Sequence, residues 1–162
     1  MATKPTFISS LNAIANGERG GHQLFRSWSD ATKDKTLKKT LDIVAVREME
    51  HSWAFEKRLN ELGFDLQPAE SSAALKKLQR MMKSKSSDVE KFAAFGIGAK
   101  PAAGAGDDQP DGLLQLLADK SIDPQTGELI GRFICEERDS GKLLTGAYQA
   151  MQRRRKRKPK AA

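Results

Sequence analysis

Glu48 and His51 are the residues of this chain whose types and spacing most directly suggest chemistry. They are three positions apart in a segment with helical periodicity, so they are expected to be neighbours on one helix face. Leu41, Val44 and Phe55 share that face, which makes it the apolar and therefore buried one. A carboxylate oxygen and an imidazole nitrogen together suit iron, manganese or zinc better than a metal that prefers thiolates. The pair is therefore predicted to bind a metal ion.

Glu18 and Glu137 stand at the corresponding place in two other apolar segments. A buried carboxylate costs several kcal/mol unless a nearby group compensates its charge. Three carboxylates that converge on one layer would repel one another, and a shared cation is the simplest remedy. His22, one helical turn after Glu18, is a further candidate ligand. The alternative is that one or more of the segments is rotated, so that its acid lies at a solvated edge.

Three long amphipathic segments are expected to position these residues. Apolar residues recur at steps of three and four along each segment, which is typical of helices that face a bundle core. The first two segments predict a helix pair over about 6–63, in which the second helix spans 36–62. Asp123 and Pro124 form a good helix start, and they open a last long helix over about 123–151.

The segment between these long helices, residues 66–122, is expected to contain short helices and a loop. Residues 72–82 have helical periodicity, and Ser87 and Glu90 have the spacing of a capping box that opens a second short helix. Residues 96–112 are rich in Gly, Ala, Pro and Asp and are predicted to form a loop, followed by a short helix over 113–118. No strand-like alternation is present at useful length, so residues 1–151 are predicted to form one all-α domain.

The order of these ligands resembles the first half of the ferritin-like and rubrerythrin-like four-helix bundles. In that family one helix supplies a Glu and the next supplies Glu-x-x-His, as Glu18 and then Glu48-Met49-Glu50-His51 would here. The resemblance implies an antiparallel four-helix bundle with an irregular, Gly/Ala-rich segment in its second half. It also implies a two-metal carboxylate site in which Glu18, Glu48 and His51 are ligands and Glu48 bridges.

The second half of that pattern is incomplete. Residues 136–140 align with residues 47–51, so Glu137 is in register, but Ser140 stands where the family has a histidine. Glu136 and Asp139 could face inward only if the last helix were rotated. No third-helix Glu is well placed, and the candidates for that ligand are Asp107, Glu90 and Asp119. The pattern predicts an asymmetric site that holds one metal ion, or two with the second bound weakly.

Two functions follow from these expectations. The first is a metal-binding protein that handles iron, or alternatively manganese or zinc, in oxygen, peroxide or iron-homeostasis chemistry. If its site is functional, it would be an oxidoreductase of ferroxidase or peroxidase type. The alternative is a non-catalytic helical scaffold in which a basic C-terminal tail contacts nucleic acid or another polyanion. A homodimer or higher homo-oligomer is expected from the family resemblance alone.

The net charge of +7 belongs to the end of the chain. Residues 153–160 hold seven basic residues and no acid, and the remaining 28 − 7 = 21 basic residues balance 21 acidic ones. Residues 152–162 are predicted to form a disordered basic tail, and weak, salt-dependent polyanion binding would use six residues: Arg153, Arg154, Arg155, Lys156, Arg157 and Lys158.

Cysteine usage and hydropathy suggest where the protein acts. The single cysteine, Cys135, excludes an internal disulfide framework and favours a reducing compartment. No apolar run resembles a signal peptide or approaches the length of a membrane span. We therefore expect a cytoplasmic protein without a membrane-spanning segment.

Overall fold

The computed structural model describes residues 5–98 and 112–157, and within them the chain forms six helices and no strand. Three helices are long: α1 (Ile8–Ala31), α2 (Lys35–Glu61) and α6 (Pro124–Arg157). Three are short: α3 (Ala73–Lys83), α4 (Asp88–Ala94) and α5 (Gly112–Leu117). The predicted all-α class is confirmed, and the helix expected over 36–62 differs from α2 by one residue at each end.

Side chains in the segments that connect the helices fix where several helices begin. Asp34 Oδ1 accepts the backbone N–H groups of Thr36 and Leu37 at the start of α2. Ser87 and Glu90 form the predicted capping box of α4. Asp123 Oδ1 accepts the N–H of Thr126 at the start of α6. The caps at Ser87 and Asp123 were predicted from the sequence, whereas the cap at Asp34 was not.

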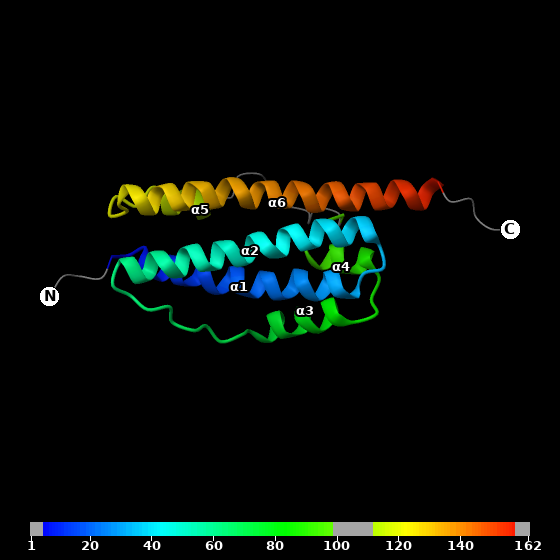
Figure 1. The fold of residues 1–162 in the computed structure, drawn as a ribbon, viewed down its shortest axis with the longest axis horizontal. Helices are drawn as coiled ribbons and strands as arrows, with labels where there is room; N and C mark the ends of the chain where they lie inside the picture. The colour runs from blue at the N-terminus through cyan, green and yellow to red at the C-terminus, as the bar shows by residue number, and fades with distance from the viewer. Residues whose placement is uncertain (1–4, 99–111, 158–162) are drawn as a thin grey trace, which may run out of the picture.

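Helices α1 and α2 form a hairpin that carries the rest of the fold (Figure 1). Helix α6 lies along α2 on one side of the hairpin, and α3 lies along α1 on the other. An extended segment returns from α2 towards α3, and Asn12 and Asn16 of α1 hold its backbone at Gln67. Among the described residues there are thus three long helices, and the short α3 and α4 stand where the resemblance implied a third long one. Polar breaks at 67–72 and 84–87 explain this difference.

The core is divided into two apolar clusters. One surrounds Trp28, Leu41 and Phe92, and the other surrounds Leu11, Phe55 and Ile130. On α2 the first cluster ends at Ala45 and the second begins at Phe55. The buried residues between these two positions are polar: Glu48, His51 and Ser52. The polar layer is therefore enclosed by apolar packing at both ends.

Helix α6 continues to Arg157, beyond residue 151 where the sequence placed the end of the helix and the start of a disordered tail. Residues 152–157 are accordingly corrected to helix. Unbroken intrahelical hydrogen bonding from the well-packed part of α6 carries the helix through this stretch, which has no glycine or proline to end it. Lys158 and the residues after it lie outside the described residues, as does most of the predicted loop over 96–112.

None of the described helices is long and apolar enough to cross a membrane.

Candidate metal centre

Each of the three long helices contributes one side chain to a compact group at the centre of the polar layer. His51 Nδ1 of α2 lies 3.0 Å from Glu18 Oε2 of α1 and 3.6 Å from Glu137 Oε1 of α6. One donor atom from each residue lies within 4.8 Å of the other two. Glu18 and His51 are buried and Glu137 is half-buried. The predicted convergence of Glu18, His51 and Glu137 is therefore found in the structure.

Glu136 holds the other side of the imidazole. His51 Nε2 donates to Glu136 Oε2 at 2.7 Å, and Arg132 Nε donates to Glu136 Oε1 at 2.9 Å. These hydrogen bonds keep the pKa of Glu136 below its usual value, although burial alone would raise it. Glu136 was predicted as a weaker ligand, and the structure places it as a hydrogen-bond partner of His51 on the side away from Glu18. Metal-bound histidines commonly have such a partner.

His51 faces a carboxylate on both nitrogens when no metal is bound. Because a carboxylate only accepts hydrogen bonds, each nitrogen carries a proton in this arrangement. Burial alone would lower the pKa of His51, but its hydrogen bonds to Glu18 and Glu136 outweigh burial and raise the pKa above its usual value. A metal ion at Nδ1 would take the place of one of these protons. The other proton would stay between Nε2 and Glu136.

Glu48 lies beside the group and in contact with the backbone of α1. A Cβ atom on Gly21 would come within 1.9 Å of Glu48 Oε2, so only glycine leaves room for this carboxyl. Burial, with a smaller effect of Glu18 and Glu137, raises the pKa of Glu48 to about 9. The Glu48 carboxyl makes no hydrogen bond with the described residues and is neutral at pH 7. Glu48 was predicted as a ligand, and the structure places it next to the three-residue group, with no donor atom in it.

One carboxylate oxygen of Glu137 is not hydrogen-bonded by the described residues, although His51 and Arg47 are nearby positive charges. Its Oε1 atom is buried and has no hydrogen-bond partner within the described part of the chain. Burial and the nearby Glu18 carboxylate raise its pKa. An unsatisfied buried oxygen is costly in a folded protein and calls for an explanation, such as an ion. The donor set and this orphaned oxygen fit a bound cation.

A cavity of about 390 Å³ opens onto the same two acids, Glu48 and Glu137. Its other walls are mainly apolar or small: Phe25, Val44, Phe95, Ile97, Ser140, Gly141, Leu144 and Thr145. The candidate centre thus has two different sides. Glu136 and Phe133 close the side behind the imidazole, where the Phe133 and His51 rings meet edge to face at 4.9 Å. The cavity gives a small molecule a route to the other side.

Arg47 of α2 contacts Ser140, the residue that stands where the family resemblance would place a second histidine. Its Nη1 donates to Ser140 Oγ at 3.1 Å and to Asp139 Oδ2 at 2.8 Å. The guanidinium therefore brings a positive charge to the half of the site that lacks an imidazole. Asp139 is drawn outward by this ion pair and is exposed, so it does not join the group. From the sequence, Arg47 was one of three arginines expected to pair with inward acids in a non-catalytic scaffold, but its contact with Ser140 was not predicted.

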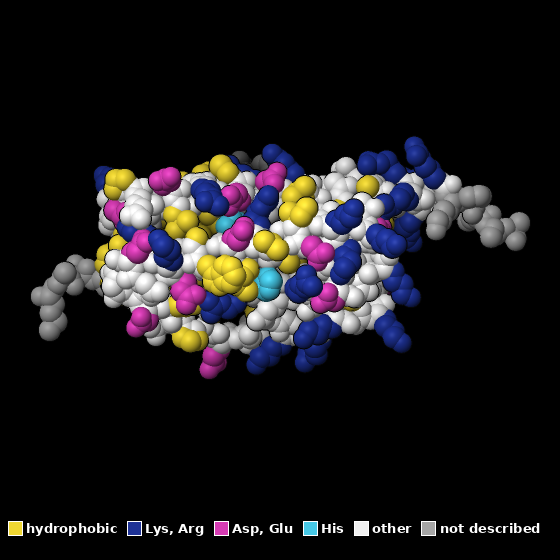
Figure 2. Space-filling model, viewed as in Figure 1, with side chains coloured by type: hydrophobic (Ala, Val, Ile, Leu, Met, Phe, Trp, Pro, Cys, Tyr) yellow, Lys and Arg dark blue, Asp and Glu magenta, His cyan; other side chains and the backbone are white. Residues whose placement is uncertain are grey.

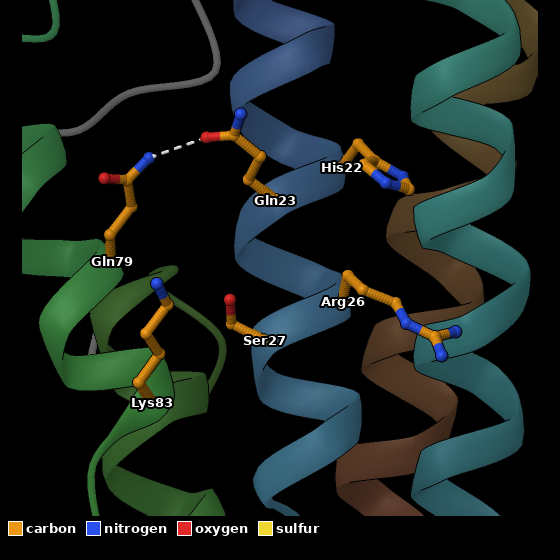
Figure 3. A pocket seen from close by; sticks show the side chains of 6 residues that line it. All are labelled: His22, Gln23, Arg26, Ser27, Gln79 and Lys83. Atoms are coloured by element: carbon orange, nitrogen blue, oxygen red, sulfur yellow. Dashed lines mark hydrogen bonds between the residues drawn. The ribbon is translucent and has the colours of Figure 1, made fainter.

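The remaining candidates lie elsewhere. His22 Nδ1 is 2.7 Å from the carbonyl oxygen of Ala45, and the ring points from α1 towards α2 (Figure 3). Its neighbours Gln23 and Ser27 point the other way, to α3. Glu90 is engaged in the cap of α4, and Asp119 accepts hydrogen bonds from Thr6 and Ser121. The third-helix candidate Asp107 lies outside the described residues.

Comparisons of the chain with models of protein families, with curated proteins and with solved structures gave no match. The resemblance to ferritin-like bundles therefore stays a prediction that rests on residues 18, 48–51 and 137.

Proposed function

We propose that Glu18, His51 and Glu137 bind one divalent transition-metal ion, and that this asymmetric carboxylate–histidine site is the working part of the protein. The observation that carries the proposal is the buried Glu137 Oε1, which has no hydrogen-bond partner among residues 5–98 and 112–157 and lies 3.6 Å from a histidine nitrogen that itself contacts Glu18. Burial keeps Glu48 neutral, and Glu18 and Glu137 share the positive charge of His51 and lack a second charge in this layer. A cation supplies that charge and satisfies the orphaned oxygen at once.

Iron is the metal we favour, with manganese and zinc as alternatives. The group offers one imidazole nitrogen and two carboxylates, which is a donor set that suits Fe²⁺, Mn²⁺ or Zn²⁺. Glu48 lies beside the group and stays outside this ligand set, because its carboxyl keeps its proton at pH 7. Arg47 at Ser140 disfavours a second metal ion by like-charge repulsion. We therefore expect one tightly bound ion per chain.

The proposed chemistry is the handling of oxygen or peroxide by bound iron, as in a degenerate member of the ferritin-like class with three long helices. Iron would supply the one-electron chemistry. The chain's own residues would do three things: Glu136 fixes the imidazole, the apolar cavity walls limit water, and Glu48 holds a proton at the cavity wall. A carboxylic acid that is neutral at pH 7 can deliver a proton to a small molecule in that cavity. Ferroxidase or peroxidase activity is the expected class.

Elemental analysis of the purified protein tests the metal site. Cells would be grown with added iron or manganese, and wild type would be compared with His51→Asn and Glu137→Gln. The matched controls are His22→Asn and Glu50→Gln, which remove the same groups outside the three-residue group. We expect close to one metal ion per chain in wild type and both controls and a loss of more than tenfold in the two site variants. Equal metal in all five proteins would refute the proposal.

A separate measurement tests the chemistry. Metal-free protein would be mixed with Fe²⁺ in air, and the formation of Fe³⁺ would be followed by absorbance against a protein-free control. The expected result is faster oxidation with wild type and Glu50→Gln than with His51→Asn. If the protein bound metal tightly but Fe²⁺ was oxidised by oxygen or peroxide no faster than without protein, the site would have a structural role instead.

A further inference from the structure

The last turns of α6 form a rigid, strongly basic projection. Figure 1 shows that α6 extends past the neighbouring end of α2. Residues 153–157 in this part of α6 are all basic, all helical and all exposed. Successive residues of an α-helix are about 100° apart around its axis, so five of them carry charge on every side of the rod. The metal site makes no use of these charges.

This projection is anchored to the body of the protein. Met151 is buried in the apolar cluster around Trp28, and Arg154 forms an ion pair with Asp34 in the turn between α1 and α2. The ion pair brings the end of α6 next to that turn, where Lys33, Lys35 and Lys39 are also exposed. We call the seven exposed side chains at this place the basic end: Lys33, Lys35, Lys39, Arg153, Arg155, Lys156 and Arg157.

The acids near the basic end are already engaged by other groups. Asp34 caps α2 and binds Arg154, and Asp30 lies 3.7 Å from both Arg26 and Lys38. Asp88 accepts hydrogen bonds from Trp28 and Thr32. No ion pair joins the basic end to a described acid. Figure 2 shows dark blue side chains gathered at this end of the molecule.

We propose that the basic end binds the phosphate backbone of double-stranded DNA, with the projecting end of α6 in the major groove. Apart from the side on which Arg154 binds Asp34, the end of α6 is charged all round, which suits a groove between two phosphate strands better than a flat surface, and the major groove of B-DNA admits an α-helix. A membrane surface is less suitable, because the exposed large apolar residues are Ile43, Val46, Trp53, Leu114 and Leu117, and none of these lies at the basic end. The major groove of double-stranded RNA is too deep and narrow for the helix.

Binding of a labelled random-sequence DNA duplex to the full chain, followed by fluorescence anisotropy across salt, tests the proposal. Each phosphate contact contributes about −0.9 to the slope of log Kobs against log salt, so about five contacts give a slope of about −4.5. Affinity should then fall about 500-fold between about 50 and about 200 mM salt. The variant R153Q/R155Q/K156Q/R157Q keeps Arg154 for its ion pair and should bring the slope to about −1.

The matched control K76Q/K77Q/R80Q/K142Q removes the same charge from exposed positions elsewhere and should keep the wild-type slope. Equal losses in the two variants would overturn the proposal, because net charge and not a defined surface would then explain binding. Circular dichroism checks that both variants are folded. Equal affinity for double-stranded RNA, or binding to anionic lipid vesicles without binding to DNA, would also overturn it.

A third variant tests whether the rigid helix matters. Three glycines inserted between Gln152 and Arg153 keep every charge but uncouple the projection from the body of α6. We expect at least a fivefold loss of DNA affinity. Unchanged affinity would show that a flexible basic tail is sufficient and would overturn the placement of a rigid helix in the groove. All of these measurements use metal-free protein with a chelator, so their outcome does not depend on the metal site.

Discussion

Replacing Glu48 with glutamine removes one titrating proton from the polar layer and keeps the shape of the side chain. The pKa of Glu48 is raised to about 9 by burial, Glu18 and Glu137, whereas an unfolded chain has a value near 4.5. Between these two values the folded metal-free protein holds a proton that the unfolded chain has lost. The free energy of unfolding must therefore decrease as the pH rises through this window.

The size of the effect follows from the width of the window. Each pH unit within it changes the stability by about 1.4 kcal/mol for one proton, so the step from about pH 5 to about pH 8 corresponds to about 4 kcal/mol. Glu137 and His51 also have raised pKa values and act in the same direction. Stability contributed by protonated His51 is present below the unfolded pKa of 6.5 and is lost as the pH rises through the folded value. Glu48→Gln should therefore flatten the profile without abolishing its slope.

Urea denaturation of metal-free protein at several pH values between 5 and 8 measures this profile. Wild type should lose about 4 kcal/mol more than Glu48→Gln over the range. Glu50→Gln, an exposed acid on the same helix, is the matched control and should follow wild type. Parallel profiles for wild type and Glu48→Gln would refute the claim that Glu48 is protonated in the folded protein. The comparison uses slopes, so a constant cost of burying the glutamine amide does not affect it.

Four further substitutions, one of them a control, test other parts of the structure. Gly21→Ala should destabilise the fold and weaken metal binding at least tenfold, because the added Cβ would meet the Glu48 carboxyl. The control Gly17→Ala adds a Cβ with nothing within 4 Å and should stabilise α1 by about 1 kcal/mol. Thermal unfolding and metal titration of both variants measure these effects. Lys91→Met should lower the free energy of unfolding, measured by urea denaturation, by about 2 kcal/mol. The reason is that the buried ammonium donates to the carbonyl groups of Met82 and Ser84 at the end of α3, and an unchanged stability would contradict that role. Asp123→Ala should cost about 2 kcal/mol at pH 7 by uncapping α6. Hydrogen bonding holds the pKa of Asp123 well below its usual value, so the difference from wild type should shrink as the pH falls below about 4, and a constant difference would speak against it.

The sequence was most informative where a local rule sufficed. Helical periodicity and the caps at Ser87 and Asp123 predicted the helices, and the spacing of Glu48 and His51 predicted their shared buried face. Each of these features depends on residues within a few positions of one another. The same periodicity placed Glu18 and Glu137 in the central layer.

Features that depend on contacts between distant segments were not predicted. Glu136 turned out to orient His51, and Arg47 to bind Ser140, because of how α6 is rotated against α2. Periodicity allows two neighbouring acids, such as 136 and 137, to compete for the inward position and does not decide between them. The role of Gly21 was not predicted either, because it depends on the approach of Glu48 from another helix. The end of α6 was placed too early because charge was taken as a sign of disorder.

The order in which the helices stack has a mechanical consequence. Helix α6 packs mainly on α2 and α5, and α2 lies between it and α1. The central cluster is a place where α1, α2 and α6 each contribute a buried or half-buried side chain within a few ångströms. An ion held there would link α1, α2 and α6 through one ligand from each helix. Its removal would leave α6 held by the two apolar clusters alone, and the backbone amides in the middle of α6 should then exchange with solvent faster than those of the α1–α2 hairpin.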